Sequence, residues 1–332
     1  MVTYRGYRTA IQYAAESAYG TGTPTTAVEG KIQTLTINKV NNLIRTTGLG
    51  EGRNETFVAF GNFEVTWSME YELASFEFLQ FAFSPVGGSG STAAPYYLEE
   101  ADYIGYTSGL MKTFAMEIAS LGSTNEVEKM VGGVINTVGF GLNVGESLKC
   151  SLEGFAKTVS NGTVATAYTA STTKPWIFSQ GNFKWNASVV ARVTSATINV
   201  NNNIDPEVGR QIGSRFPEAM EFGLRKYDFV LTVKMTDTVA TTLRDAFFGQ
   251  ANTPNLGVAS AEPTFYEVIF ELSEGATSGL RNAQIKLSNC AINDISKPIN
   301  IGDNIVELTI NGTAKSGTLD TTNRPIKWWT ST

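Results

Sequence analysis

The sequence contains no histidine and only two cysteines among its 332 residues. Without histidine, the chain cannot form a Ser-His-Asp or Cys-His nucleophile system, a histidine general base or a histidine-containing zinc site. Cys150 and Cys290 lie in apolar predicted strands, where a thiol usually packs as a small hydrophobic group. A disulfide between them is the less favoured alternative, because sparse cysteine suits assembly in a reducing cytoplasm. We therefore predict that the protein is not an enzyme and has no catalytic residue, cofactor or metal site.

Charge is also sparse in this sequence. Charged residues make up 17% of the chain, whereas about a quarter is usual in globular proteins. The net charge is −6, and no basic stripe of the kind found in nucleic-acid-binding proteins is present. So little charge predicts that much of the surface is covered in an assembly. The alternative is an ordinary β protein rich in threonine and asparagine.

Long apolar runs are missing as well. No run approaches the ~20 residues that a membrane-spanning helix needs. The first twenty residues contain two arginines but not the apolar core of a secretion signal. We therefore expect a soluble protein with no membrane association.

What the sequence does contain is an internal repeat. A stretch of about fifty residues runs from Thr34 to Phe83 and occurs again from Ser195 to Phe248. The matched segments are Thr36-Ile37-Asn38 with Thr197-Ile198-Asn199, Asn41-Asn42-Leu43 with Asn202-Asn203-Ile204, and Arg53 and Gly61 with Arg215 and Gly223. Further downstream, Ile135-Asn136 matches Ile292-Asn293, and Gly154, Ala156 and Lys157 match Gly312, Ala314 and Lys315. A repeat of this length predicts a whole-domain duplication.

The duplication suggests an organisation in five parts. We expect an N-terminal arm (1–30), a first domain (31–158), a linker (159–175), a second domain (176–316) and a C-terminal tail (317–332). The arm is rich in tyrosine and is expected to dock on a neighbouring subunit, as is the Trp328-Trp329 pair in the tail. The linker is polar and of low complexity, which is typical of a flexible connection.

Hydrophobic periodicity predicts mostly β-strands. Apolar and polar residues alternate strictly from Phe63 to Glu70, which is the pattern of a half-buried strand. A strand around 32–40 precedes it, and a polar, glycine-rich loop at 45–60 joins the two. From residue 72 to 83, phenylalanines at helical spacing predict a short amphipathic helix that packs on the sheet. In the second half we expect strands at 193–204, 226–235, 264–272, 283–296 and 304–315, a loop at 205–222 and a helix at 238–248.

The duplicated stretch resembles the tail tube proteins of long-tailed phages and related archaeal viruses. The resemblance lies in the strand TLTIN…NNLI, the loop GLGEGR, the strand GNFEVTWSME and their counterparts ATINVNNNI and YDFVLTVKM, followed by the closing stretch INIGDNIVELTINGTAKSG. It extends over residues 30–316, and the order and spacing of the segments carry it. Many tube proteins have one such domain per chain, so the duplication is a departure.

The resemblance implies a mainly β fold. Each domain would be a small β-sandwich or half-barrel with one short flanking α-helix, duplicated in tandem, and its strands would join those of neighbours into a closed lumen barrel. Two domains per chain would then form trimeric rings with pseudo-sixfold symmetry, and the rings would stack into a tube that conducts viral DNA. Hexameric rings with the second domain on the outside are the competing arrangement.

The resemblance also implies contact residues. Arginines in the two long loops, Arg45, Arg53, Arg210 and Arg215, are candidates for contacts with carboxylates of the next ring. Glu64, Glu70 and Glu153 are candidates for the lumen face, on the evidence of strand alternation alone. A wall with few lysines and arginines suits the passage of DNA, because phosphate contacts are the source of affinity for DNA.

The implied partners are those of a tail. They are further copies of the chain, a tape-measure protein, a tail terminator and distal tail or baseplate proteins, while double-stranded DNA passes through without specific binding. The protein would be assembled in the host cytoplasm and would reside in the virion tail. A secreted or surface β-sandwich adhesin or carbohydrate-binding module is the alternative function.

Overall fold

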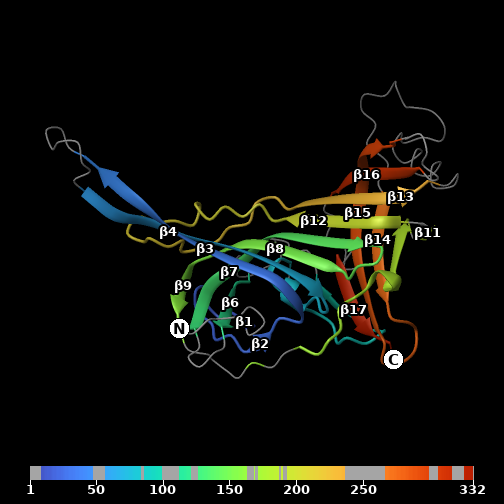
Figure 1. Cartoon of the computed structure of the whole chain (residues 1–332), viewed down its shortest axis with the longest axis horizontal. Coiled ribbons are helices and arrows are strands. Elements are labelled where there is room, and N and C mark those ends of the chain that lie inside the picture. Colours follow the sequence, from blue (N-terminus) through green and yellow to red (C-terminus); the bar gives the residue numbers. More distant parts are fainter. Residues whose placement is uncertain are drawn as a thin grey trace.

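The computed structural model describes residues 9–47, 57–83, 86–98, 112–120, 126–162, 168, 171–186, 188–189, 193–235, 266–298, 306–315 and 325–331. We refer to residues 9–162 as the first half and to residues 171–331 as the second half. Both halves are built from β-strands, and all the strands belong to one large antiparallel sheet (Figure 1).

The first half contains nine strands and one short helix in its described residues. They are β1 (Thr9–Ala15), β2 (Thr26–Ala27), β3 (Gly30–Thr46), β4 (Phe57–Leu73), the 3-10 helix η2 (Glu77–Phe81), β5 (Tyr96–Leu98), β6 (Phe114–Ser120), β7 (Glu126–Asn143), β8 (Lys149–Ala156) and β9 (Thr158–Asn161).

The second half contains eight described strands and the short helix η3. They are η3 (Phe178–Gln180), β10 (Gly181–Trp185), β11 (Ser188–Val189), β12 (Val193–Asn201), β13 (Lys226–Lys234), β14 (Tyr266–Ser273), β15 (Arg281–Ser296), β16 (Glu307–Ala314) and β17 (Ile326–Thr330). The strands predicted from the sequence in this half are confirmed within a few residues, while the predicted helix 238–248 lies outside the described residues.

Eight strands form a continuous central layer in the order β3-β4-β8-β7-β12-β13-β16-β15. The long strands β7 and β15 pass from this layer into a second layer. The first part of β7 pairs with β6 and β9, and the first part of β15 pairs with β14 and β17. The sheet therefore curves over a core but does not close into a barrel within one chain.

The strand pairings of the first half recur in the second half. The pairs β3–β4, β4–β8, β7–β8, β6–β7 and β1–β6 correspond to β12–β13, β13–β16, β15–β16, β14–β15 and β10–β14. Even the irregularities match, because a register shift lies between Ile135 and Thr137 in β7 and between Ile292 and Asp294 in β15. The sequence repeat is thus also a repeat of topology.

A close packing of glycine on an aromatic ring recurs in the same way. A Cβ added to Gly154 would lie 1.9 Å from the Val134 carbonyl oxygen and 2.9 Å from the Trp67 indole nitrogen. A Cβ on the corresponding Gly312 would lie 2.2 Å from the ring of Phe229. Only glycine lets the large ring of the neighbouring strand lie flat across the backbone at this position.

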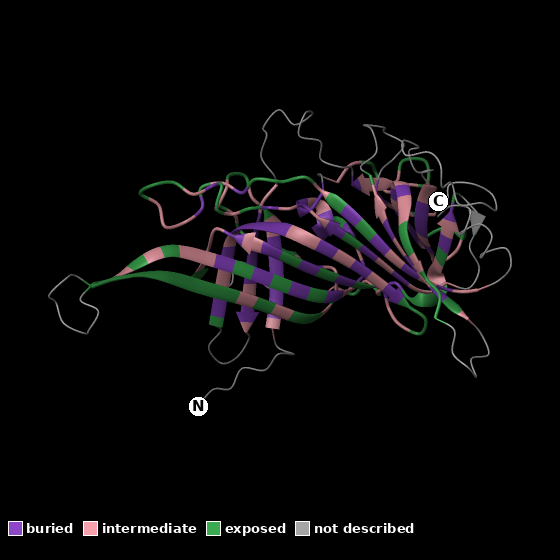
Figure 2. Ribbon diagram, turned by 90° about the horizontal axis from the view of Figure 1, so that it is seen from above, coloured by how far each residue is buried: buried purple, intermediate pink, exposed green. Residues whose placement is uncertain are grey.

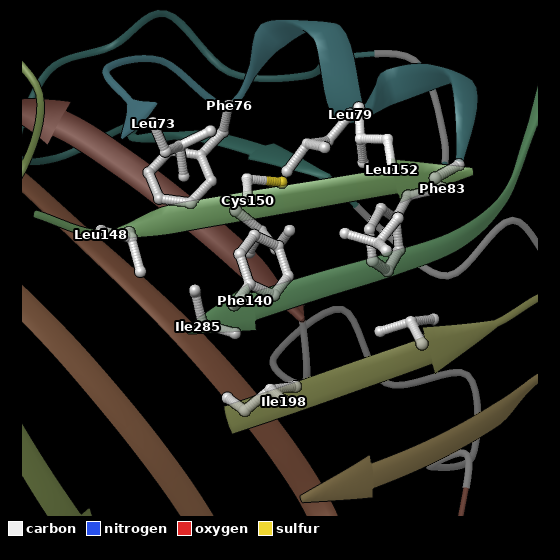
Figure 3. Close-up of a cluster of buried hydrophobic side chains, with 14 of the residues drawn as sticks. Leu73, Phe76, Leu79, Phe83, Phe140, Leu148, Cys150, Leu152, Ile198 and Ile285 are labelled. Atoms are coloured by element: carbon white, nitrogen blue, oxygen red, sulfur yellow. The ribbon is translucent and has the colours of Figure 1, made fainter. Parts of the chain in front are cut away.

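The core lies between the two layers. Alternate residues of β4 are buried from Val65 to Leu73, as the sequence pattern predicts. The apolar residues that follow β4 belong to the same buried cluster, and Figure 3 shows Phe76, Leu79 and Phe83 beside Cys150 and Leu152 of β8. The buried residues that follow β4 are Phe76, Phe78, Leu79, Phe81 and Phe83. The predicted α-helix is wrong, since only the five-residue 3-10 helix η2 forms here. The apolar side chains are buried on nearly every side of this short connection, which leaves no polar face for a longer helix.

Two further expectations need correction. The predicted loop 45–60 is shorter than expected, because β3 runs to Thr46 and β4 begins at Phe57, so the two strands form a long hairpin. Part of the predicted N-terminal arm belongs to the fold, because β1 pairs along its whole length with β6 of the same chain. Ile11 and Tyr13 of β1 are buried in the core.

Both cysteines are free and buried. Burial raises the pKa of the Cys150 thiol to about 12. Burial likewise raises the pKa of Cys290 to about 12. Neither thiol is therefore a reactive thiolate near neutral pH.

Candidate assembly surfaces

The two halves meet in the central layer through one strand pair. β12 of the second half pairs with the last part of β7 in the first half, from Asn201 opposite Thr137 to Ser195 opposite Asn143. The Ser195 hydroxyl also donates a hydrogen bond of 2.7 Å to Oδ1 of Asn143. The contact joins different edges of the two halves, so it is a heterologous, head-to-tail contact.

The central layer ends in two outer edges. They are formed by the counterparts of the two strands that meet in the β7–β12 contact. β3, which corresponds to β12, pairs only with β4 among the described strands. Residues 291–296 of β15, which correspond to the paired part of β7, bond only to β16 among those strands. The sheet of each chain therefore ends in two exposed edges, β3 and the last part of β15, which could pair with each other between chains in the way that β12 pairs with β7. Unpaired strand edges of this kind are templates for strand addition.

One face of the central layer is polar along its whole width. On β4, β8 and β13 its residues alternate with the buried residues of the opposite face (Figure 2). Its central rows are Thr34, Thr36 and Asn38; Thr66, Ser68 and Glu70; Ser151 and Glu153; Thr137, Gly139 and Gly141; Thr197 and Asn199; Asp228, Val230 and Thr232; Thr309, Asn311 and Thr313; and Asp294 and Ser296. These described rows contain no lysine or arginine; Lys31, Lys149, Lys226 and Lys234 lie at the rims.

The predicted lumen acids all lie on this polar side. Glu70 and Glu153 are exposed, and Glu153 accepts a hydrogen bond of 3.4 Å from the Thr137 hydroxyl. Glu64 lies further out along β4, where the Asn42 amide donates to it and Arg210 approaches to 3.8 Å. Alternation within β4 places Glu64 and Glu70 on one side, and the pairing of β4 with β8 brings Glu153 to the same side.

Sequence reasoning missed two acids of the same face, Asp228 on β13 and Asp294 on β15. Asp228 alternates with buried neighbours in the sequence, so the signal was present there, whereas Asp294 lies between an exposed and a partly buried residue. Their place beside Glu153 depends on the order of the strands, which the sequence did not reveal.

The connection between β12 and β13, residues 202–225, folds over the first half. It lies along the base of the β3–β4 hairpin (Figure 1). Arg215 donates from Nε to the Gly61 carbonyl at 2.9 Å and from Nη2 to Oδ1 of Asn41 at 2.7 Å. The Phe63 amide donates to the Arg215 carbonyl at 2.9 Å. Lys157 forms an ion pair of 3.3 Å with Glu218. We call this segment the β12–β13 connection.

The four predicted contact arginines therefore have different surroundings. Arg210 and Arg215 contact the first half of their own chain, and Arg210 also forms an ion pair of 2.7 Å with Glu207. Arg45 is exposed near the tip of the β3–β4 hairpin, and Arg53 lies outside the described residues. Contacts of these arginines with a next ring stay a prediction.

The C-terminal strand fastens the second half to the first. β17 pairs with β15 on one side and with β5 of the first half on the other. The Trp328 ring lies between Phe76 and Tyr96, at 5.8 and 5.6 Å between ring centres. The predicted anchor on a neighbouring subunit is thus an anchor within the chain, as far as Trp328 is concerned. Arg281 adds to the seam, because it donates to the Ala74 carbonyl at 3.2 Å and stacks on Trp176.

The described residues hold no group of three or more potential metal ligands among aspartate, glutamate and cysteine. Likewise, no helix within the described ranges is long and apolar enough to cross a bilayer.

These features define a class, namely a structural protein made of one antiparallel sheet with matching open edges. The comparison with protein families then assigns the chain. The model of a family described as phage tail tube protein matches residues 6–314, so the chain belongs to the phage tail tube protein family. It is a structural, non-enzymatic component of the phage virion tail. A comparison with curated proteins finds no match.

Family membership confirms the resemblance drawn from the duplicated stretch. It also decides against the adhesin or carbohydrate-binding alternative.

Proposed function

We propose that three chains close into a ring in which β15 of each chain pairs with β3 of the next. The observation that supports this most directly is the β7–β12 contact, since it is already a joint of this kind between two halves of one chain. A heterologous contact repeated with the same geometry closes into a ring or continues as a helix. In the ring, three joints within chains would alternate with three joints between chains, giving pseudo-sixfold symmetry.

The dimensions agree with a tube for DNA. Eight central strands per chain give 24 strands (3 × 8). At ~4.8 Å between strands and a tilt of about 40°, the backbone diameter is ~48 Å. A hexamer with the second half on the outside is less well supported, because β12, β13, β16 and β15 continue the same layer as β3, β4, β8 and β7.

The polar face would line the lumen, with the buried face turned to the outer layer. Its hydroxyl and amide groups hydrogen-bond readily with water, and its four central carboxylates, Glu70, Glu153, Asp228 and Asp294, repel phosphate. Such a wall lets DNA slide, because affinity for DNA comes mainly from cationic contacts with phosphate. This assigns to Glu70 and Glu153 the lumen position expected from the sequence, and leaves Glu64 near the rim.

The proposal extends to the domain organisation and partners. We infer that the chain arose by tandem duplication of a tube domain, with the first domain at 31–158 and the second at 176–316. Stacked rings would make a tube that meets a tape-measure protein inside, a tail terminator at one end and distal tail or baseplate proteins at the other.

The joint can be tested by disulfide cross-linking. In the β7–β12 contact Asn199 lies opposite Gly139, and the corresponding residues across the joint are Asn38 and Ser296. The double variant Asn38→Cys with Ser296→Cys should therefore form covalent trimers under mild oxidation, seen on a non-reducing gel and as rings of three chains by electron microscopy. The matched control is Asn38→Cys with Asp294→Cys, which is two residues out of register and should cross-link far less. Rings of six chains, or equal cross-linking of both variants, would contradict the proposal.

A further inference from the structure

The β3–β4 hairpin and the β12–β13 connection are corresponding segments with opposite surroundings. Leu43 and Val58 on the hairpin are 42% and 54% exposed. Their counterparts in the second half, Ile204 and Met220, are 6% and 4% exposed. The hairpin extends away from the rest of the chain, with most of its outer part exposed (Figure 2). Its other exposed apolar residues are Val40, Ile44, Phe57 and Phe60.

Ile204 and Met220 are buried because the β12–β13 connection packs on the first half of the chain. Ile204 and Met220 form a small cluster with Val134 of β7, and Phe155 of β8 and Tyr19 pack against it. These contacts cross the β7–β12 joint from the second half to the first. The hairpin has no preceding half within its own chain, so the same apolar positions remain exposed.

The hairpin shares one local feature with the β12–β13 connection, a close backbone contact at a glycine. In the connection, the chain turns where Asn203 has a φ of 48°, opposite Gly223. A Cβ on Gly223 would lie 2.6 Å from the Asn203 carbonyl oxygen, and a Cβ on Gly61 would lie 2.3 Å from that of Asn42. Both segments therefore have the same close backbone crossing that only glycine permits, and β3 has a register shift at this point, between Asn41 and Leu43.

We propose that, in the ring, the outer part of the hairpin (residues 40–46 and 57–60) lies on the second half of the preceding chain. This inference rests on the proposed ring and names a further surface of its joint. Leu43 and Val58 would cover the region of Ala291, the counterpart of Val134. The occupant is a second copy of this chain, because the surface continues the β15–β3 joint and its apolar residues are those whose counterparts are buried across β7–β12.

Cross-linking in isolated rings tests this contact. The variant Leu43→Cys with Ala291→Cys, in a background with Cys150→Ala and Cys290→Ala, should form a disulfide between chains in single, unstacked rings. The matched control, Ile204→Cys with Val134→Cys in the same background, should form a disulfide within the monomer. A bond between chains that appears only after rings stack would mean that the hairpin contacts the next ring, and would overturn the inference.

A second variant keeps the test decisive if the cysteine background folds poorly. Leu43→Asp should lower the fraction of chains in rings more than tenfold at equal concentration, while the monomer melts at an unchanged temperature because the residue is exposed there. Ile212→Asp, on the fully exposed tip of the β12–β13 connection, should change ring yield less than twofold. Equal yields for the two variants would contradict the inference. If the unmodified protein forms no rings at all, the proposed function is wrong and the inference falls with it.

Discussion

The β3–β4 hairpin and the β12–β13 connection begin with the same asparagine pair and end at the same glycine, yet one is a straight pair of strands and the other a folded loop. Their neighbours account for the difference. The connection has the first half beside it and buries Ile204 and Met220 on that surface, while the hairpin extends from the open edge of the chain. Corresponding stretches can therefore take different secondary structures when one has an apolar surface to cover, since packing outweighs local propensity.

The joints around the halves differ in a similar way. Within the chain, the β7–β12 joint is reinforced by β17, β5 and the β12–β13 connection. Among the described residues, the open edges at β3 and β15 offer their backbone groups and the hairpin. We expect the joints within chains to be formed first and the joints between chains to be the weaker set.

The largest expected effect on stability comes from the glycine packing that both halves share. Gly154→Ala places a methyl group against the Val134 carbonyl, and Gly312→Ala places one against the Phe229 ring. Each should lower the free energy of unfolding by about 3 kcal/mol or more, because neither strand can move without breaking its pairing. Urea unfolding followed by tryptophan fluorescence measures this. The control is Gly141→Ala, where a Cβ would meet nothing within 4 Å, and a loss as large there would show that the close packing is not the cause.

A smaller effect is expected for the anchor that only the second half has. Trp328→Ala removes a partly buried ring from between Phe76 and Tyr96, and we expect it to cost ~2 kcal/mol of stability, below the range for a fully buried tryptophan. Trp329→Ala, the neighbour on the opposite face of β17, is the matched variant and should cost less. Thermal melting of both monomers compares them, and equal losses would argue against Trp328 as the specific anchor.

The smallest expected effect is on the pH dependence of stability, through the ion pair between Arg281 and Glu274. The Arg281 guanidinium holds the pKa of the Glu274 carboxyl below its usual range through hydrogen bonds. A carboxyl with a lowered pKa in the folded state contributes stability above its unfolded pKa and loses it as the pH falls through the folded pKa. Glu274→Gln should therefore reduce the loss of stability between pH 6 and pH 3 by less than about 1 kcal/mol, since the pair is partly exposed. The measurement is the melting temperature of the variant and of the unmodified protein across this pH range. Equal slopes of melting temperature against pH would contradict the prediction.

Several features of the protein followed from the sequence by itself. The absence of histidine excluded histidine-based enzyme chemistry, because this depends only on which side chains exist. The alternation from Phe63 to Glu70 located β4 and sorted its residues between core and solvent, because neighbouring side chains on a strand point to opposite faces. The repeat predicted two similar halves, and the recurring strand pairings agree with it.

The other features were decided by the tertiary structure, because they depend on contacts between segments that are far apart in the sequence. Whether Phe76 to Phe83 forms a helix depends on how many sides of that segment are buried. The register of β12 on β7, which brings Asn199 opposite Gly139, depends on long-range pairing between residues far apart in the sequence. The position of Arg215 on Gly61 depends on which surface lies next to the β12–β13 connection. Local pattern determines which face of a strand is apolar, but only the assembled sheet determines which strands become neighbours and which edges stay open.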